Sequence, residues 1–320
     1  MAESPPIEVR GLVKRYGEIT AVDDVDLTVN SGDVFGYLGP NGAGKTTSLR
    51  MMLGLIRPSA GSVRLFGRDP QISVAALEGV AGFVEAPSFY PYLSGLDNLK
   101  LCAALDGTAT TTTIDEVLEI VELRDRAKDK VKGYSHGMRQ RLGIASALLR
   151  KPRLLLLDEP ATGLDPAGMR DMRVLIRDLG ERGITVLLSS HQMMEVEELC
   201  NRVAIIRSGR VAYEGSLAEL RGRAGVSYRL RTTDDARAKD VCLAQPGIEE
   251  VAETGEAGLT FKAADEGSVA ALSVALAESG APVLELTPRQ ATLEDLFFQL
   301  TEDDGQEPSL RREQLIEELA

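Results

Sequence analysis

The pattern of hydrophobic and polar positions along the chain predicts an α/β protein. Apolar residues alternate with polar ones at Val25, Leu27 and Val29, so we expect two short strands around a turn within residues 7–29. Short, wholly apolar runs follow, which are typical of strands buried on both faces of a sheet. The other elements expected in this part of the chain are strands at 34–38, 61–66, 80–84, 153–159 and 184–190, a hairpin at 202–215, and helices at 47–56, within 163–183 and from 216.

Two later regions have a different texture. Residues 86–150 show helical periodicity broken by turns, which predicts a helical subdomain. From Val226 the expected order is strand, helix, strand, strand, helix, strand, which is the βαββαβ order of a ferredoxin-like α+β unit. The expected elements of this unit lie at 226–232, 234–243, 248–252, 259–263, 267–279 and 283–286. We therefore divide the chain into a first domain (1–222, with the helical subdomain at about 86–150), a small second domain (223–301) and an acidic tail (302–320) that we expect to be flexible.

The segment after the strand at 34–38 carries candidate phosphate-binding chemistry. Gly39 to Thr46 reads G-x-x-x-x-G-K-T, between an expected strand and an expected helix. Its glycines allow the backbone to point successive N–H groups into one concavity, and the helix that follows adds the positive end of its dipole. In such a loop Lys45 reaches the β- and γ-phosphates, and the Thr46 hydroxyl ligates Mg²⁺. The alternative is an ordinary glycine-rich turn of an α/β unit.

Two other expected strands end in residues that suit phosphate chemistry. Asp158 and Glu159 follow one apolar run, and His191 follows another. Ligands of open α/β sheets bind beyond the carboxyl ends of the strands, so we expect these side chains near the phosphate loop. Asp158 then suits a hold on Mg²⁺, and Glu159 suits activation of a water molecule. An acid pair that caps the next helix, and a purely structural histidine, are the alternatives.

Two more features have both a functional and a structural interpretation. Ser135 and Gly137 lie at the start of an expected amphipathic helix, where a small hydroxyl and a glycine backbone can bind an anion. A serine in this place is also a good N-cap. Tyr16, in the turn near the N-terminus, can stack on a nucleotide base or fill local space in a hairpin. Both pairs of interpretations stay open at this point.

Composition narrows the function classes. The net charge is −13 and the pI about 4.8, which argues against nucleic-acid binding. Three cysteines without C-x-x-C spacing predict neither a metal site nor a disulfide framework and fit a reducing compartment. We find no signal-peptide pattern at the N-terminus and no apolar run near the ~18 residues that span a bilayer. If the protein works at a membrane, we expect a partner to hold it there.

Taken in order, these motifs resemble the ATP-binding subunits of ABC transporters over residues 7–222. GPNGAGKT is similar to Walker A, YSHGM to the family signature, LLLLDEP to Walker B, GLDP to the D-loop and His191 to the switch histidine. The resemblance implies a P-loop NTPase fold of the ABC ATPase type, with an antiparallel β subdomain and a helical subdomain. It also implies ATP and Mg²⁺ as cofactors, with Tyr16 stacked on adenine. The other residues implied to bind the nucleotide are Gly39, Pro40, Asn41, Gly42, Ala43, Gly44, Lys45, Thr46, Thr47, Ser135, Gly137 and Asp165.

The resemblance also implies partners. Two such domains close face to face, and each ATP lies between Lys45 of one domain and Ser135 of the other. Only one set of motifs is present in this chain, so a second copy or a paralogue must supply the other half. Separate transmembrane permease subunits would hold the ATPase at the cytoplasmic face of the membrane.

The chain departs from the family pattern in two places. His136 and Met138 stand where the signature usually has Gly and Gln, although Ser135 and Gly137 keep the expected contacts. Glu85 stands where the family usually has Gln. A carboxylate can still ligate Mg²⁺, directly or through water, but it is not an amide. Glutamate in this place, followed by APSFYPYL, is similar to the daunorubicin-resistance-like branch of bacterial drug and antibiotic exporters.

The predicted function is ATP hydrolysis that drives separate transmembrane subunits, for drug or lipophilic small-molecule efflux. Glu159 would act as general base, while Lys45 and His191 stabilise charge. An ABC ATPase acting on ribosomes or DNA is one alternative, but such chains carry two motif sets or long coiled coils. A regulator that uses ATP only as a dimer switch is another, and a phosphate-release assay separates it from an ATPase.

Overall fold

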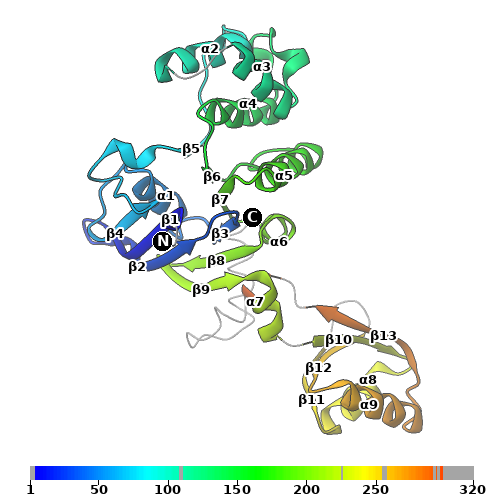
Figure 1. The fold of residues 1–320 in the computed structure, drawn as a ribbon. Coiled ribbons are helices and arrows are strands. Elements are labelled where there is room, and N and C mark those ends of the chain that lie inside the picture. The colour runs from blue at the N-terminus through cyan, green and yellow to red at the C-terminus, as the bar shows by residue number, and fades with distance from the viewer. Residues whose placement is uncertain are drawn as a thin grey trace. The chain divides into compact units, whose positions relative to one another are not determined.

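The computed structural model describes residues 4–107, 111–224, 226–253 and 258–290, together with Leu293, Leu296 and Phe297. This part of the chain divides into two units between Leu217 and Ala218, and Figure 1 shows the elements of both. The expected tail at 302–320 lies outside the described residues.

A three-stranded antiparallel sheet forms the first layer of unit 1. It consists of β1 (Ile7–Tyr16), β2 (Ile19–Val29) and β4 (Ala60–Leu65), in the order β2-β1-β4. The two strands expected within residues 7–29 and the strand expected at 61–66 are thus confirmed. The expected alternation is visible in the burial of β2, because Val25, Leu27 and Val29 are buried, whereas Asp26 is exposed and Thr28 is half-buried.

The second layer is a six-stranded sheet in the order β5-β6-β7-β3-β8-β9. The strands are β3 (Val34–Leu38), β5 (Val80–Phe83), β6 (Leu154–Asp158), β7 (Thr185–Ser190), β8 (Arg202–Arg207) and β9 (Arg210–Ser216). All neighbours from β5 to β8 are parallel, and β9 runs antiparallel to β8. Every residue of β6 and β7 is buried, which explains their unbroken apolar pattern.

Helix α1 (Lys45–Met52) connects the two layers, because it contacts β2 and β4 of one sheet and β6 of the other. Its Leu49, Met51 and Met52 join the core between the sheets. Two helices pack on the second sheet. Helix α5 (Pro166–Glu181) contacts β7, and helix α6 (Met193–Leu199) contacts β3 and β7. The sequence did not predict α6.

The helical region lies where it was expected. It contains α2 (Gly95–Asp106), α3 (Thr111–Ile120) and α4 (His136–Leu148), and short 3-10 helices at Arg124–Arg126 and Val131–Gly133. Helix α4 contacts α2, α3 and α5, as well as strand β5. A further 3-10 helix, Val74–Leu77, precedes β5. Helix α4 therefore links the helical region to the edge of the six-stranded sheet.

Unit 2 opens with α7 (Leu217–Ala224), whose first residue still belongs to unit 1. It has the strands β10 (Val226–Thr232), β11 (Ile248–Glu253), β12 (Leu259–Ala263) and β13 (Val283–Gln290), and the helices α8 (Asp235–Ala244) and α9 (Glu266–Glu278). The sheet is antiparallel in the order β11-β12-β10-β13, the topology of a ferredoxin-like unit. Leu230, Phe261, Leu272 and Leu276 belong to its core.

Candidate nucleotide-binding and catalytic site

Strand register brings the ends of three parallel strands together. Asp158, at the end of β6, lies opposite Ser189 of β7. Ser190, at the end of β7, lies opposite Leu38 of β3. The three segments that continue from these strands are the phosphate loop, the segment from Glu159 and the segment from His191. They therefore leave the sheet side by side at its carboxyl edge, which is the usual ligand-binding edge of an open α/β sheet.

The phosphate loop runs from the end of β3 to the start of α1. Gly44, the N-cap of α1, has φ 102°, and a Cβ at this position would lie 2.4 Å from the Ala21 carbonyl oxygen. Only glycine fits there, because any other residue would adopt a strained backbone conformation and its Cβ would clash with this oxygen. Asn41 and Gly42 are exposed at the tip of the loop. Residues 39–47 thus form a turn whose N–H groups and helix dipole suit an anion.

Lys45 is almost completely buried at this edge, with 5% of its surface exposed. Its Nζ donates hydrogen bonds to the carbonyl oxygens of Gly39 (2.7 Å) and Pro40 (3.1 Å). It also lies 3.2 Å from Oε1 of Glu159. The ammonium therefore stays inside the loop and already faces a carboxylate, so a phosphate that binds there takes over an existing charge partner.

The buried carboxylate of Asp158 faces the phosphate loop. Thr46 Oγ1 donates a hydrogen bond to Oδ2 (2.9 Å), and Ser189 Oγ donates to Oδ1 (2.5 Å). A hydroxyl and a carboxylate are hard oxygen donors that suit Mg²⁺, which normally completes its shell with water and substrate phosphates. No group of three or more His, Cys, Asp or Glu side chains that could hold a metal by itself occurs in the described part of the chain. The donor set thus fits a magnesium ion shared with a nucleotide.

Glu159 has three partners. His191 Nδ1 lies 2.9 Å from Oε2, and Thr162 Oγ1 donates to the same oxygen at 2.8 Å, while Lys45 faces Oε1. Partial burial pushes the pKa of Glu159 up, but the hydrogen bonds from His191 and Thr162 and the positive charge of Lys45 outweigh burial and lower the pKa to about 2. Glu159 also has φ 47°, which is unusual for a residue with a side chain. The carboxylate is therefore ionised and held in one orientation.

A second group of predicted residues gathers at the start of α4. Ser135, Gly137 and Asp165 line one pocket with a volume of about 320 Å³. Ser135 Oγ accepts from the N–H of Met138 (3.2 Å), and Asp165 Oδ1 accepts from the N–H of Gly168 (2.9 Å), so each side chain also caps a helix. Both interpretations of Ser135 thus remain compatible with the geometry, since a cap can also line a binding pocket.

Thr162 connects the two groups. Its hydroxyl donates to Glu159, and its carbonyl oxygen lies 3.1 Å from Nε2 of His136. A carbonyl oxygen can only accept, so Nε2 of His136 carries the proton in this contact. The histidine that replaces the usual signature glycine therefore links the start of α4 to the loop that orients Glu159.

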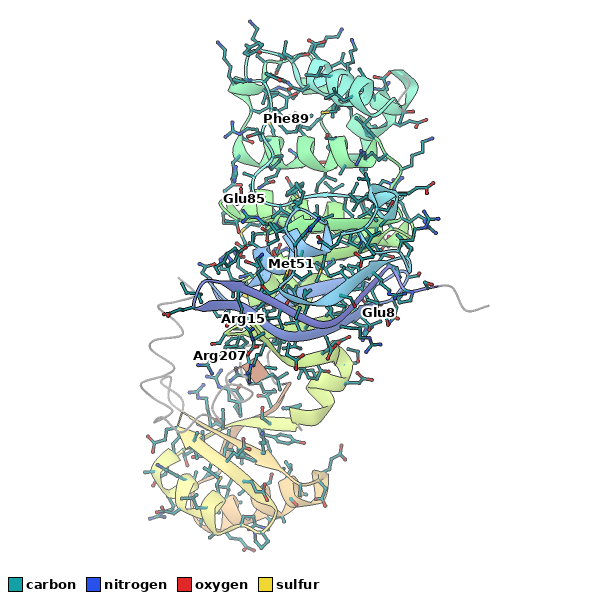
Figure 2. The ribbon with its side chains drawn as sticks, turned by 90° about the vertical axis from the view of Figure 1, so that its left-hand side faces the viewer. Glu8, Arg15, Met51, Glu85, Phe89 and Arg207 are labelled. Atoms are coloured by element: carbon teal, nitrogen blue, oxygen red, sulfur yellow. The ribbon has the colours of Figure 1, made fainter. Side chains whose placement is uncertain are left out.

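Tyr16 and Glu85 lie outside these two groups of contacts. Tyr16 is 49% exposed, and Lys14 Nζ lies 5.0 Å from the centre of its ring, so the ring does not fill a core. Glu85 forms an ion pair with Arg50 of α1, and Figure 2 shows it between Met51 and Phe89.

Sequence reasoning missed several residues of the site. Ser189 orients Asp158 and accepts a hydrogen bond from the Glu159 backbone N–H (3.0 Å). Its signal was a serine pair at the end of an otherwise apolar run, just before His191. Arg50 had no local signal, because it pairs with Glu85, 35 positions later. Thr162 lies only three residues after Glu159, but a threonine in a turn does not by itself mark a site.

Fold and site together define a nucleoside-triphosphate-binding protein of the P-loop class, with a phosphate loop, a buried acid and an ionised carboxylate at one sheet edge. Comparison with known proteins specifies the family. A sequence model of the family described as "ABC transporter" matches residues 22–162. The chain belongs to the ATP-binding subunits of this family, and it is an ATPase.

Three relatives illustrate the similarity. The uncharacterized ABC transporter ATP-binding protein YdbJ of Bacillus subtilis is 39% identical and covers 96% of this chain and 99% of its own length. The bacitracin transport ATP-binding protein BcrA of Bacillus licheniformis is 39% identical, with coverage of 92% and 96%. The daunorubicin resistance ATP-binding protein DrrA3 of Streptomyces coeruleorubidus is 35% identical, with coverage of 93% and 96%.

Solved structures show the same fold. The ATP-binding subunit of an ABC transporter matches with a TM-score of 0.61 and 28% identity, over 68% of this chain and 92% of the other. A dimeric ATP-binding cassette in a post-hydrolysis state, bound to ADP and Pi, matches with a TM-score of 0.59 and 25% identity, over 66% and 98%. None of the helices in the described ranges has the length and apolar character needed to cross a membrane.

Proposed function

We propose that this ATPase is the subunit that powers a drug or antibiotic exporter at the cytoplasmic face of a membrane. It pairs with a second ATPase subunit, itself or a paralogue, and drives separate transmembrane permease subunits. The observation that carries the proposal is the convergence of Lys45, Asp158 and Glu159 at one sheet edge. The bacitracin and daunorubicin relatives support the class of cargo, and the dimeric cassette supports the pairing.

Mg-ATP binds along the phosphate loop. The N–H groups of residues 39–47 surround the phosphates, and the exposed ring of Tyr16 stacks on adenine. Thr46 and Asp158 would hold the magnesium ion, which would neutralise phosphate charge when bound. Lys45 turns from Glu159 to the β- and γ-phosphates, where its charge stabilises the transition state of phosphoryl transfer.

Glu159 is the general base for the attacking water. In the nucleotide-free geometry its pKa is about 2, after burial is outweighed by His191, Thr162 and Lys45. Departure of Lys45 to the phosphates removes one of the causes that lower this pKa, so Glu159 becomes a stronger base once substrate is bound. His191 keeps the carboxylate in place, and it would stabilise charge on the phosphate.

Ser135, Gly137 and Asp165 serve the second subunit's nucleotide. Each ATP would lie between Lys45 of one subunit and the pocket that begins at Ser135 of the other. With Mg-ATP, Glu159→Gln should form a dimer in analytical ultracentrifugation, because it binds ATP without consuming it. Adding Ser135→Arg should leave an ATP-bound monomer, whereas Ser62→Arg, the same change at an exposed position of strand β4, should leave the dimer intact. A dimer that survives Ser135→Arg contradicts the proposed pairing.

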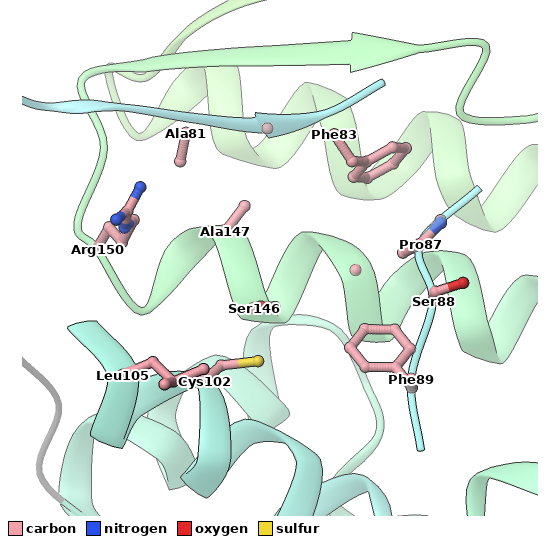
Figure 3. A pocket seen from close by; sticks show the side chains of 12 residues that line it. Ala81, Phe83, Pro87, Ser88, Phe89, Cys102, Leu105, Ser146, Ala147 and Arg150 are labelled. Carbon is pink, nitrogen blue, oxygen red and sulfur yellow. The ribbon is translucent and has the colours of Figure 1, made fainter. Parts of the chain in front are cut away.

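A pocket beside the helical region suits the permease. Figure 3 shows it between β5, α2, α4 and the segment at Pro87 to Phe89, with a volume of about 320 Å³. Phe83, Phe89 and Leu105 give it apolar walls, and Leu105 is 81% exposed at its rim. A cytoplasmic permease segment with apolar side chains would bury this surface.

Co-purification from native membranes tests the permease contact. The parent protein should bring a membrane protein with it, and Leu105→Arg should lose that partner while it keeps basal ATP hydrolysis. A permease that still co-purifies with Leu105→Arg excludes this pocket as the contact.

A further inference from the structure

The Arg50–Glu85 ion pair joins helix α1 to the segment that follows β5. Arg50 lies on α1, four residues after Thr46, so both side chains lie on the same side of the helix, about one turn apart. Glu85 comes two residues after Phe83, which pairs with Leu157 next to Asp158. The carboxylate is thus held by the helix that carries Thr46, close to the strand end that carries Asp158.

The backbone at Glu85 is held in an uncommon conformation. Its φ is 73°, in the left-handed region that residues with a Cβ seldom adopt. Such a conformation persists only where surrounding contacts impose it, and these places are often functional. The Glu85 carboxylate forms its ion pair with Arg50, and 66% of the Glu85 side chain remains exposed. An exposed ion pair is weak, so the carboxylate can change partners easily.

The segment that follows Glu85 forms one wall of the pocket in Figure 3. Pro87, Ser88 and Phe89 line the pocket, and Pro87 packs so closely on α4 that a Cβ at Gly143 would lie 2.6 Å from it. A movement of Glu85 would therefore also move Pro87 to Phe89, which line the pocket and contact α4. Glu85 lies at the junction of the nucleotide edge and this pocket.

We propose that Arg50 is a positioning residue that holds Glu85 away from the magnesium site until Mg-ATP binds. Glu85 then exchanges Arg50 for the magnesium ion, directly or through water, and the segment 86–89 moves with it. The inference rests on the proposed function, because it needs Mg-ATP at the phosphate loop. It explains how a carboxylate can stand where the family usually has an amide, since Arg50 neutralises its charge while no cation is bound.

A single tryptophan can report this movement. The chain has no tryptophan, so Phe89→Trp gives one fluorophore in the wall of the pocket. We expect its emission to change with a non-hydrolysable ATP analogue plus Mg²⁺, and much less with the analogue plus EDTA. In Arg50→Gln the nucleotide-free emission should already be shifted, and the half-saturating Mg²⁺ concentration should fall about two- to fivefold, the range typical of an exposed ion pair. Arg50→Lys should behave like the parent.

A double-mutant cycle separates this role from a merely structural one. If Arg50 acts through Glu85, Arg50→Gln changes neither emission nor Mg²⁺ midpoint in a Glu85→Gln background. Arg68→Gln, which breaks the comparable exposed pair with Glu78 (3.1 Å), is the matched control and should have no effect. Equal effects of Arg50→Gln in both backgrounds, or no effect in either, would overturn the inference.

The same experiment distinguishes failure of the proposed function. Lys45→Ala, added to the Phe89→Trp variant, should abolish the response of the introduced tryptophan to nucleotide. A parent protein that binds no nucleotide in a thermal-shift assay would refute the proposed function itself. A parent that binds Mg-nucleotide normally, combined with a Phe89→Trp variant that gives no emission change, refutes only the role of Arg50 and Glu85.

Discussion

Replacement of Glu159 by glutamine separates two effects of one carboxylate. The variant removes the negative charge but keeps the size of the side chain and its ability to bond Thr162. In the nucleotide-free protein it leaves Lys45, which is buried, without its ion pair. In the nucleotide-bound protein it removes the proposed general base. We therefore expect Glu159→Gln to bind Mg-ATP but hydrolyse it far more slowly, and to be less stable than the parent without nucleotide.

The size of each effect follows from the site. A lowered pKa means that the ionised carboxylate stabilises the fold at pH values above its ordinary 4.5, and that this contribution is lost as the pH falls towards about 2. This difference between the ordinary pKa of Glu159 and its pKa in the folded protein corresponds to about 3 kcal/mol, at about 1.4 kcal/mol per pKa unit. At pH 7.5 we expect nucleotide-free Glu159→Gln to lose about 1–3 kcal/mol of unfolding free energy, because glutamine keeps part of the hydrogen bonding. Turnover should fall about 10²–10⁴-fold, as expected for loss of a general base.

Urea unfolding at pH 7.5 and a phosphate-release assay measure these quantities. Mg-ATP should shrink the stability deficit, because Lys45 gains the phosphates as partners. Glu119→Gln is the control, since Glu119 pairs with Arg124 at 3.1 Å on the exposed surface and should change neither stability nor turnover appreciably. Near-parental hydrolysis by Glu159→Gln would refute its role as base. Unchanged nucleotide-free stability would refute the argument from the Lys45 pair.

Three further changes test other parts of the site. Lys45→Ala should show no thermal shift with Mg-ATP, because the ammonium that meets the phosphates is gone; a shift like that of the parent contradicts its role. Gly44→Ala should cost about 2 kcal/mol or more in urea unfolding, since its Cβ would meet the Ala21 oxygen at 2.4 Å, whereas Gly42→Ala, with nothing within 4 Å, should cost less. Burial raises the pKa of Glu195 despite its hydrogen bond with Ser190. The free energy of unfolding therefore falls as the pH rises above 4.5 towards the pKa that Glu195 has in the folded protein. The Tm of Glu195→Gln minus that of the parent should therefore be higher at pH 8 than at pH 5. A Tm difference that does not depend on pH would contradict this.

The sequence was a good guide wherever one local pattern decides the structure. The run LLLLD predicted a buried strand, and it forms β6, buried at every residue. The βαββαβ order after Val226 likewise predicted both the elements and the topology of unit 2. In both cases the period of apolar residues reports directly on burial, so no long-range information is needed.

Local patterns failed for α6 and for the contacts that orient the site. Helix α6 has seven residues, MMEVEEL, and no side-chain cap, so it is too short to show a helical period and depends on packing against β3 and β7. Glu85 meets a residue 35 positions earlier, and His136 meets a carbonyl 26 positions later. Such pairs form only after the chain has folded, and nothing in either local sequence marks the partner.

In the proposed mechanism, Lys45 couples nucleotide binding to the strength of the general base. The ammonium lies 3.2 Å from Glu159 before nucleotide binds, and the phosphates need the same ammonium. Any stabilisation of the Lys45–Glu159 pair must therefore oppose ATP binding, and by thermodynamic reciprocity ATP binding must weaken that pair. Since the charge of Lys45 helps to lower the pKa of Glu159, its departure raises the basicity of the carboxylate only when a phosphate has taken its place. In the proposed mechanism a single lysine thus keeps the base weak without substrate and strengthens it with substrate.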